Sequence, residues 1–423
     1  MIARLYDKPN VQIHCREVTF QVTEDCCMAC TYCYQHHKTN NKMTWEIIKP
    51  FLDELFTDKN SLINTSTTEG LIFDFIGGEP LMEIELIDKI CTYSFNYMIE
   101  HHHPWLLKTK FSLCTNGLLY FTPKVQNFIN KFGFFCSIGF SIDGDKTLHD
   151  LCRKDLAGNG TYDRALAAAI DYSKKTKIEL RTKMTLSPEN IKYAANAIID
   201  LVKRGFTNIS VNCIYEEGWT YEHGTILYYE FKKIADYIIE NDLYDKVFIR
   251  IFNRQLYDEL SDDYTSNWCG GIADTNLAID YKGKIFSCIR YMESSLNGHQ
   301  PELPIGDITN GYLSSDEYKK NYNLMSNITR QSQSTQECLE CPVANGCSWC
   351  SAYNYERFGD INHRATFICP MHKAASLVNV YYWNMLYKKV GLQDVFQMRL
   401  QETEIDKIIS SDEKELLYQL TRR

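Results

Sequence analysis

Short apolar stretches and amphipathic stretches alternate six times in the first 250 residues of this 423-residue chain. The apolar stretches are rich in β-branched and aromatic residues, as strands are, and the stretches between them have apolar residues at helical spacing. Such alternation predicts a parallel sheet with right-handed helical crossovers. Six units are fewer than the eight of a closed barrel, so we expect an α/β fold that is an open, partial (β/α)6 barrel of the TIM type. The expected strands cover residues 17–23, 71–76, 109–114, 136–142, 178–186 and 208–214.

The remainder of the chain lacks this alternation. Residues 251–373 are irregular and rich in Cys, Gly and Asn, so we expect a second domain that metal clusters hold together. From Ala374 the pattern predicts a helix, and a charged tail follows it. The sequence therefore predicts three parts: a barrel over 1–250, a cluster-containing domain over 251–373 and a C-terminal helical segment over 374–423.

Composition argues against two classes of protein. A formal net charge of −9 leaves no broad basic surface for nucleic acid. No stretch approaches the ~20 apolar residues of a membrane span, and the N-terminus has no basic region followed by an apolar core. We therefore expect a cytoplasmic protein that binds neither nucleic acid nor membrane.

Seventeen cysteines in a chain without a secretory signal indicate reduced thiols or metal ligands rather than disulfides. Cys26, Cys30 and Cys33 form a Cys-x3-Cys-x2-Cys loop directly after the first expected strand. Three thiolates that face one 4Fe-4S cluster would leave one iron open to a small chelating molecule. The alternative is a zinc knuckle with His36 or His37 as the fourth ligand. Cys27 lies in the same loop but gives a different spacing, so it is left out of the ligand set.

This cysteine loop, with Tyr32 just before its last cysteine, resembles the signature of radical S-adenosylmethionine enzymes. A second motif follows the second expected strand and resembles the family's GGEP motif: Gly77, Gly78, Glu79 and Pro80. The resemblance implies that this motif holds the amino group of the methionine moiety. Its chemistry agrees, because two glycines permit close backbone approach and a carboxylate suits an ammonium group.

Further segments resemble the peptide-modifying branch of that family. The CTNG and SIDG runs, which contain Asn116, Ser141 and Asp143, end the third and fourth expected strands. The resemblance implies that they border the adenosylmethionine pocket. The following HDLCRKDLAGNG segment resembles the branch's HDxxR…GxG segment and implies that Arg153 pairs with the methionine carboxylate. A guanidinium fork suits a carboxylate, whereas from the residues alone a surface salt bridge is the alternative.

The C-terminal cysteines resemble the SPASM domain, which carries auxiliary iron–sulfur clusters. The resemblance implies an outer cluster held by Cys338, Cys341, Cys347 and Cys369, and an inner cluster held by Cys269, Cys288 and Cys350. With the first cluster, the chain is expected to hold three 4Fe-4S clusters and S-adenosylmethionine. Zinc ribbons are the alternative.

The sequence departs from the SPASM pattern in two ways. Cys347 and Cys350 are separated by two residues instead of three, and no further cysteine lies near Cys269. The inner cluster is therefore expected to keep an open iron for a substrate thiolate, unless Cys152 or Cys213 acts as its fourth ligand.

The resemblance implies an oxidoreductase that cleaves S-adenosylmethionine reductively and uses the 5′-deoxyadenosyl radical to take hydrogen from a peptide. We expect it to install a thioether crosslink in a ribosomally made peptide. The alternatives are a sulfatase-type maturase that forms formylglycine and a peptide cyclase that joins two carbons. A non-catalytic iron–sulfur electron carrier is the alternative from another class, but it would not require GGEP or an open cluster. No acid or base residue can be named from the sequence.

The expected partners are a substrate peptide with a leader and a flavodoxin or ferredoxin-type reductant. About 16 residues precede the first expected strand, too few for the winged-helix-like leader-binding domain of some relatives. Leader recognition is therefore expected to use another surface or a separate protein.

Overall fold

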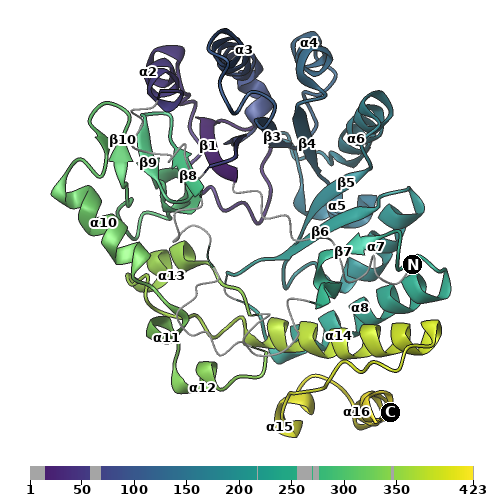
Figure 1. Ribbon diagram of the computed structural model, residues 1–423. Helices are drawn as coiled ribbons and strands as arrows, with labels where there is room; N and C mark the ends of the chain where they lie inside the picture. The colour runs from purple at the N-terminus through teal and green to yellow at the C-terminus, as the bar shows by residue number, and fades with distance from the viewer. Residues whose placement is uncertain are drawn as a thin grey trace.

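The computed structural model describes residues 15–57, 68–216, 218–254, 269, 276–343 and 347–422. Within them, one sheet of eleven strands runs in the order β11-β10-β9-β8-β1-β2-β3-β4-β5-β6-β7 (Figure 1). Its strands are β1 (Cys15–Thr23), β2 (Gly70–Gly77), β3 (Lys110–Thr115), β4 (Cys136–Ser141), β5 (Arg181–Leu186), β6 (Asn208–Cys213), β7 (Phe248–Ile249), β8 (Asn276–Ile279), β9 (Lys284–Phe286), β10 (Gly306–Asp307) and β11 (Gly311–Tyr312).

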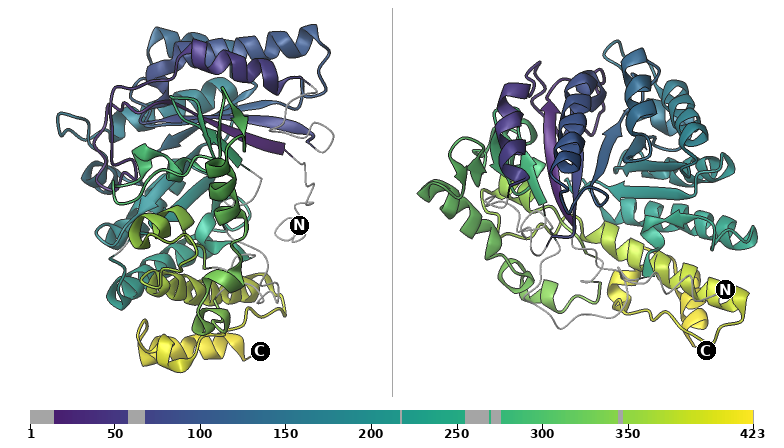
Figure 2. Two further views of the ribbon diagram at one scale, coloured as in Figure 1. Left: turned by 90° about the vertical axis from the view of Figure 1, so that its left-hand side faces the viewer. Right: turned by 45° about the horizontal axis from the view of Figure 1, so that its top comes forward.

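All six strands expected from the sequence are present, and neighbouring strands from β1 to β7 pair in parallel. The sheet is not closed, because β7 and β11 lie at opposite ends of the strand order. Helices connect the strands and cover the outer side of the curved sheet (Figures 1 and 2). They are α2 (Trp45–Leu55), α3 (Ile84–Glu100), α4 (Pro123–Phe132), α5 (Lys146–Cys152), α6 (Tyr162–Thr176), α7 (Ala194–Lys203) and α8 (Tyr221–Glu240).

The two faces of the parallel sheet differ in polarity. Phe73 and Phe75 of β2 and Leu113 of β3 are buried, whereas the alternating residues Asp74 and Cys114 are only partly buried. Parallel sheets usually bury both faces and have nearly continuous apolar strands. Alternation in these strands therefore means that the face away from the helices is polar and partly open to solvent.

The segment after residue 275 contains more regular structure than the sequence predicted. Strand β8 pairs in parallel with β1, with Phe20 opposite Ile279, so this segment extends the same sheet. Its strands are two to four residues long, too short for a hydrophobic period to be recognised. Four short helices follow: α10 (Asp316–Ser326), α11 (Arg330–Gln333), α12 (Gln336–Leu339) and α13 (Ser351–Phe358).

The predicted C-terminal helix is α14 (Cys369–Val390), which packs along α8. The charged tail after α14 is partly helical, because it contains α15 (Glu402–Ile405) and α16 (Ser411–Thr421). Glu413 of α16 accepts hydrogen bonds from Tyr228 (2.7 Å) and Lys232 (2.6 Å) of α8, which holds the tail against the α8–α14 pair.

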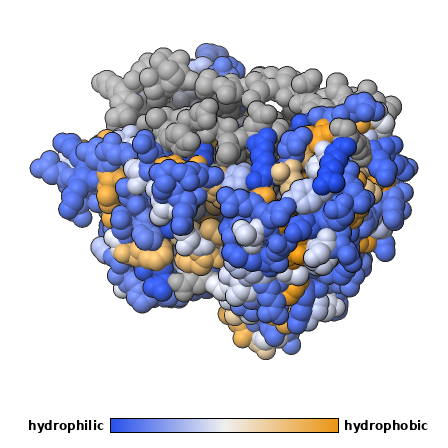
Figure 3. Space-filling view, turned by 90° about the horizontal axis from the view of Figure 1, so that it is seen from below, coloured by the Kyte–Doolittle hydropathy of each residue, from blue (hydrophilic) through white to orange (hydrophobic). Residues whose placement is uncertain are grey.

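Helices long and apolar enough to cross a membrane are absent from the described part of the chain. Figure 3 shows a face, seen from below Figure 1, that is mostly hydrophilic, with hydrophobic residues in separate small groups.

Candidate functional site

The first cysteine group lies on the loop that follows β1. Cys26 is buried, and Cys30 and Cys33 are partly buried. The Cys33 backbone N–H donates to the Cys30 carbonyl (3.2 Å), which makes the loop compact. Burial raises the pKa of Cys30 to about 11, and the charges of Cys33 and Cys26 add to this effect while Arg153 opposes it. The three thiols are therefore close enough for a charge on one to act on the others.

This donor set suits an iron–sulfur cluster. Thiolates are the ligands that such clusters use. Among the described residues, no group of three or more His, Cys, Asp or Glu side chains is already arranged to hold a metal ion. None of the sixteen cysteines whose side chains are described forms a disulfide.

The GGEP motif packs directly against this loop. A Cβ atom on Gly78 would lie 2.2 Å from the Asp25 carbonyl oxygen and 2.7 Å from the Cys26 Cβ, so only glycine fits there. Gly77 is similarly confined by the carbonyl oxygen of Thr23, at 2.6 Å. The Glu79 backbone N–H donates to the Asp25 carbonyl (2.8 Å), which joins the end of β2 to the cysteine loop.

The Glu79 carboxylate is buried and already has three donors. Thr115 Oγ1 (2.6 Å), the Asn116 backbone N–H (2.9 Å) and the Leu81 backbone N–H (3.1 Å) all donate to it. Burial raises the pKa of Glu79 to about 7, although these hydrogen bonds oppose the shift. In this structure Glu79 therefore links the ends of β2 and β3, a role that its sequence motif did not indicate.

Cys27, which the sequence analysis left out, is also part of this region. Its Sγ accepts a hydrogen bond from Asn116 Nδ2 (3.4 Å). The hydrogen bond with Cys26 is the largest of the effects that lower the pKa of Cys27, and Asn116 contributes. The sequence signal that could have included Cys27 in the site is its position directly after Cys26.

Ser141 is the remaining polar residue of the expected pocket. Its Oγ lies 3.7 Å from Cys114 Sγ.

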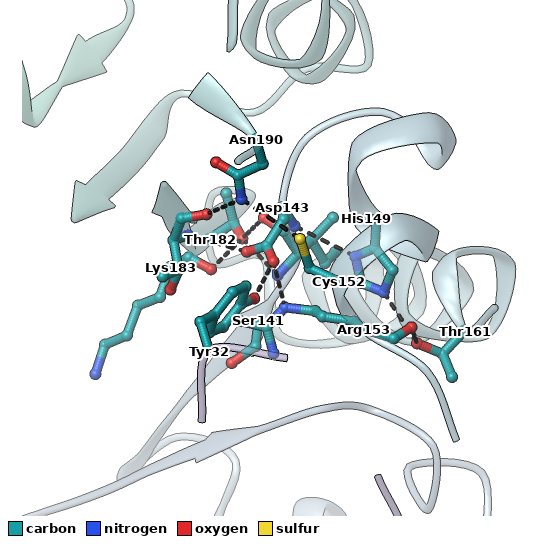
Figure 4. Close-up of polar contacts among 12 residues, drawn as sticks. Tyr32, Ser141, Asp143, His149, Cys152, Arg153, Thr161, Thr182, Lys183 and Asn190 are labelled. Atoms are coloured by element: carbon teal, nitrogen blue, oxygen red, sulfur yellow. Dashed lines mark hydrogen bonds and ion pairs between the residues drawn. The ribbon is translucent and has the colours of Figure 1, made fainter. Parts of the chain in front are cut away.

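Asp143 is the centre of a buried polar network (Figure 4). Its Oδ2 accepts from Arg153 Nε (2.8 Å) and from the Tyr32 hydroxyl, and its Oδ1 accepts from the Thr185 backbone N–H (3.0 Å). Asp143 is fully buried and Arg153 is 8% exposed. The surface salt bridge considered for Arg153 is therefore wrong. The network joins the cysteine loop, through Tyr32, to the ends of β4 and β5.

His149 supports the same network from α5. Its Nδ1 accepts from the Asp143 backbone N–H (3.2 Å), and its Nε2 lies 3.0 Å from Thr161 Oγ1. Burial lowers the pKa of His149 to about 4. The neutral ring is therefore the form that fits the folded chain, with Nε2 as the donor to Thr161.

We expect this buried histidine to make the chain less stable in acid. The folded pKa is below the ordinary value of about 6.5, so stability falls as the pH drops from 6.5 toward 4. Between about pH 8 and about pH 5.5 the expected loss of unfolding free energy is about 1 to 1.5 kcal/mol. Urea unfolding of the wild type and His149→Gln at both pH values measures it, with the exposed His101→Gln as a control. An equal pH effect in all three proteins would contradict the prediction.

The second cysteine group contains Cys338, Cys341, Cys347 and Cys369. The charges of the other three cysteines act on Cys369, whose pKa burial raises to about 12. Burial alone would also raise the pKa of Cys347, but His372 and Arg364 outweigh it and lower this pKa to about 6. The sequence analysis missed both basic residues, since neither is part of the cysteine spacing.

The third cysteine group contains Cys269, Cys288 and Cys350. Burial raises the pKa of Cys288 to about 12, and the charges of Cys269 and Cys350 contribute. Cys350 is the N-cap residue directly before α13, and its Sγ accepts from the Tyr353 backbone N–H (3.4 Å). Ser351 Oγ donates to Cys269 Sγ (3.1 Å).

The two cysteines considered as a fourth ligand of this group differ in position: Cys152 belongs to another polar network, whereas Cys213 and Cys350 both act electrostatically on Tyr215. Cys152 Sγ accepts from Asn190 Nδ2 (3.5 Å) in the polar network of Figure 4. Burial is the cause of the raised pKa of Cys213, which reaches about 12.

The fold and the cysteine loop together define a class of protein. An open α/β sheet with three thiols on the loop after its first strand, and with a glycine pair packed against that loop, is suited to hold a 4Fe-4S cluster beside a small ligand. Residues 15–145 match the family described as "4Fe-4S single cluster domain".

Individual relatives narrow this class. The chain is 25% identical over 283 residues to the cysteine-type anaerobic sulfatase-maturating enzyme of Clostridium perfringens, covering 63% of this chain and 72% of that protein. It is 22% identical over 372 residues to the serine-type enzyme of Bacteroides thetaiotaomicron, covering 81% of this chain and 84% of that protein.

Solved structures share the fold. Native anSMEcpe with bound AdoMet and Kp18Cys peptide aligns with a TM-score of 0.65 and 17% identity, over 89% of this chain and 100% of that chain. Streptococcus suis SuiB bound to precursor peptide SuiA aligns with a TM-score of 0.57 and 16% identity, over 84% of this chain and 76% of that chain. The sequence relatives thus confirm the resemblance to radical S-adenosylmethionine enzymes, and the solved structures confirm the fold.

Proposed function

We propose that the chain is a radical S-adenosylmethionine maturase that installs a thioether crosslink in a ribosomally made peptide. The observation that carries the proposal is the gathering of thiols into separate groups of three, three and four, in which members of each group act on one another electrostatically. In this proposal residues 1–250 form the partial barrel, 251–373 the SPASM domain and 374–423 the C-terminal segment.

The residues of the first group have distinct tasks in this proposal. Cys26, Cys30 and Cys33 hold a 4Fe-4S cluster, and Gly77 and Gly78 let the backbone approach its ligand. When bound, the cluster and S-adenosylmethionine supply reductive cleavage and a 5′-deoxyadenosyl radical that takes a substrate hydrogen. Arg153, held by Asp143, is the candidate partner of the methionine carboxylate. The buried network around Asp143 keeps the cysteine loop fixed against the strand ends.

The third group favours sulfur chemistry. Cys269, Cys288 and Cys350 are three thiols, so a 4Fe-4S cluster held by them would have an iron free for a substrate thiolate. A thioether forms when a substrate carbon loses one hydrogen atom to the radical and its sulfur partner loses a proton. A cluster held by Cys269, Cys288 and Cys350 would be placed to take up the remaining electron. The electron that the first cluster needs for reductive cleavage would come from a flavodoxin or ferredoxin-type reductant.

A second candidate function is formation of formylglycine in a sulfatase. The two sulfatase-maturating relatives support it as directly as the shared fold supports a peptide maturase. The product distinguishes the two functions, because a thioether retains the cysteine sulfur and formylglycine does not.

The experiment uses the full chain reconstituted with iron and sulfide, S-adenosylmethionine and a chemical reductant. We expect about twelve irons per chain, four for each cluster, and formation of 5′-deoxyadenosine. Mass spectrometry of the Kp18Cys peptide and of cysteine-containing precursor peptides encoded beside the gene then separates the candidates. Tightly bound zinc with little iron, or no 5′-deoxyadenosine, would refute the proposed function.

A further inference from the structure

The three cysteine groups differ in the charges around them. Each has an arginine with a largely buried side chain beside it: Arg153 at the first group, Arg290 at the third and Arg364 at the second. Arg153 pairs with Asp143 (2.8 Å), and Arg290 pairs with Glu216 (2.9 Å). Among the described residues, no carboxylate lies within ion-pair distance of Arg364. The second group is therefore the one whose arginine has no carboxylate partner in the described part of the chain.

Arg364 lies in the loop between α13 and α14 and is 6% exposed. Its Nη1 donates to Ser334 Oγ (2.9 Å), and its Nη2 donates to the backbone carbonyl of Cys347 (3.2 Å). Burial alone would lower the pKa of Arg364, but the charge and hydrogen bond of the Cys347 thiol outweigh it and raise this pKa. The charges of Cys338 and Cys369 add to the shift. The guanidinium therefore lies close enough to the second group for several of its thiols to act on it.

Trp349 lies beside the same group. It is between Cys347 and Cys350 in the sequence, is 4% exposed, and has its ring centre 4.4 Å from Cζ of Arg364. Its Nε1 is buried and has no hydrogen-bond partner among the described residues. An indole nitrogen can only donate, and a buried N–H without an acceptor costs free energy. An acceptor supplied by a bound group would remove that cost.

A 4Fe-4S cluster held by the four thiolates of the second group fits both residues. It would bring negative charge to the guanidinium, and a buried charge needs such a partner. It would also bring sulfur atoms that can accept the indole N–H, since the sulfurs of such clusters take part in hydrogen bonds.

We propose that Arg364 is the counter-charge of the outer cluster and that Trp349 donates its indole N–H to a sulfur of that cluster, so that both residues raise its reduction potential. Reduction adds one electron, and so one negative charge, to the cluster. A nearby positive charge and an N–H donor therefore stabilise the reduced form more than the oxidised form. This inference rests on the proposed function, because it assumes a 4Fe-4S cluster at the second cysteine group.

The test is a redox titration of the reconstituted full chain with dithionite, followed by electron paramagnetic resonance of the reduced clusters. The variant Cys338→Ala with Cys341→Ala lacks the outer cluster and so identifies its signal. Arg364→Gln is expected to lower the ratio of reduced to oxidised outer cluster about tenfold at a fixed potential, a shift of about 59 mV toward more negative values for one electron. The potentials of the other two clusters are expected to stay unchanged.

Two further variants separate charge from hydrogen bonding. Arg364→Lys keeps the positive charge and is expected to restore part of the potential that Arg364→Gln loses. Trp349→Phe keeps an aromatic ring and removes the N–H, so we expect it to lower the same ratio about threefold. The matched control is Arg204→Gln, which removes an exposed guanidinium and therefore the same net charge. It is expected to leave all three potentials unchanged.

An unchanged potential in Arg364→Gln would overturn the proposal. A shift that belongs to the first or the inner cluster, or an equal shift in Arg204→Gln, would do the same. If Arg364→Gln does not assemble the outer cluster, Trp349→Phe decides by the same measurement, and an unchanged ratio in that variant overturns the proposal.

Failure of this inference and failure of the proposed function are distinguishable. Absence of 5′-deoxyadenosine from the wild type, or zinc in place of the iron of the outer cluster, refutes the function. Unaltered potentials in variants that keep the iron content of the wild type refute only the roles of Arg364 and Trp349.

Discussion

Replacement of Cys26, Cys30 and Cys33 together by alanine is expected to reduce 5′-deoxyadenosine formation to the background level. Without these thiolates the first cluster has no ligands, so S-adenosylmethionine has no iron to bind. The other two groups are far along the chain and keep their thiols, so iron is expected to fall from about twelve to about eight atoms per chain. Iron analysis and chromatography of the reaction products measure both results.

The matched control removes two cysteines outside the three groups. Cys91 and Cys136 are buried in the apolar core, and replacing both by alanine is expected to leave the iron content unchanged. Undiminished 5′-deoxyadenosine in the triple variant would show that the assignment of the first cluster is wrong. A complete loss of iron would instead mean that the three groups do not assemble independently.

The substitution Asp143→Ala is expected to lower the free energy of unfolding by about 3 to 5 kcal/mol, because it leaves the buried Arg153 guanidinium without a counter-charge. It also removes the acceptor of the Tyr32 hydroxyl and of the Thr185 backbone N–H. Urea unfolding of the reconstituted chain measures the loss. A change below about 1 kcal/mol would contradict the inferred importance of the network.

Two further variants separate the structural role of this pair from ligand binding. The double variant Asp143→Leu with Arg153→Met removes both charges and is expected to recover much of the stability, as paired replacements often do. If Arg153 binds the methionine carboxylate, the double variant still loses about 1.5 to 3 kcal/mol of S-adenosylmethionine binding by calorimetry. Unaltered binding would leave Arg153 with a structural role alone.

The location of the first cysteine group could be predicted because all its members lie on one short loop. Cys26, Cys30 and Cys33 span eight residues directly after a strand with a strong apolar pattern. Spacing along the chain is sufficient to predict that the three cysteines lie close together, because each peptide unit spans only a few ångströms. The same reasoning located Gly77 and Gly78 at the end of the next strand.

The surroundings of Arg153 could not be predicted in the same way. The sequence motif implied a ligand carboxylate as a partner of Arg153, and it did not indicate that the guanidinium also pairs with Asp143, ten residues away. The Tyr32 hydroxyl, from another part of the chain, meets the same carboxylate. Spacing alone does not specify which buried charge meets which, because that depends on how the strand ends come together.

The sequence by itself determined the six strand–helix units and the short cysteine loop, because hydrophobic period and local spacing are properties of neighbouring residues. The tertiary structure alone decided that β8 pairs with β1, that His372 and Arg364 meet Cys347, and that Glu356 lies beside His36. These contacts join residues separated by 17 to more than 250 positions. Folding selects them through packing and burial of charge, which leave no periodic trace in the sequence.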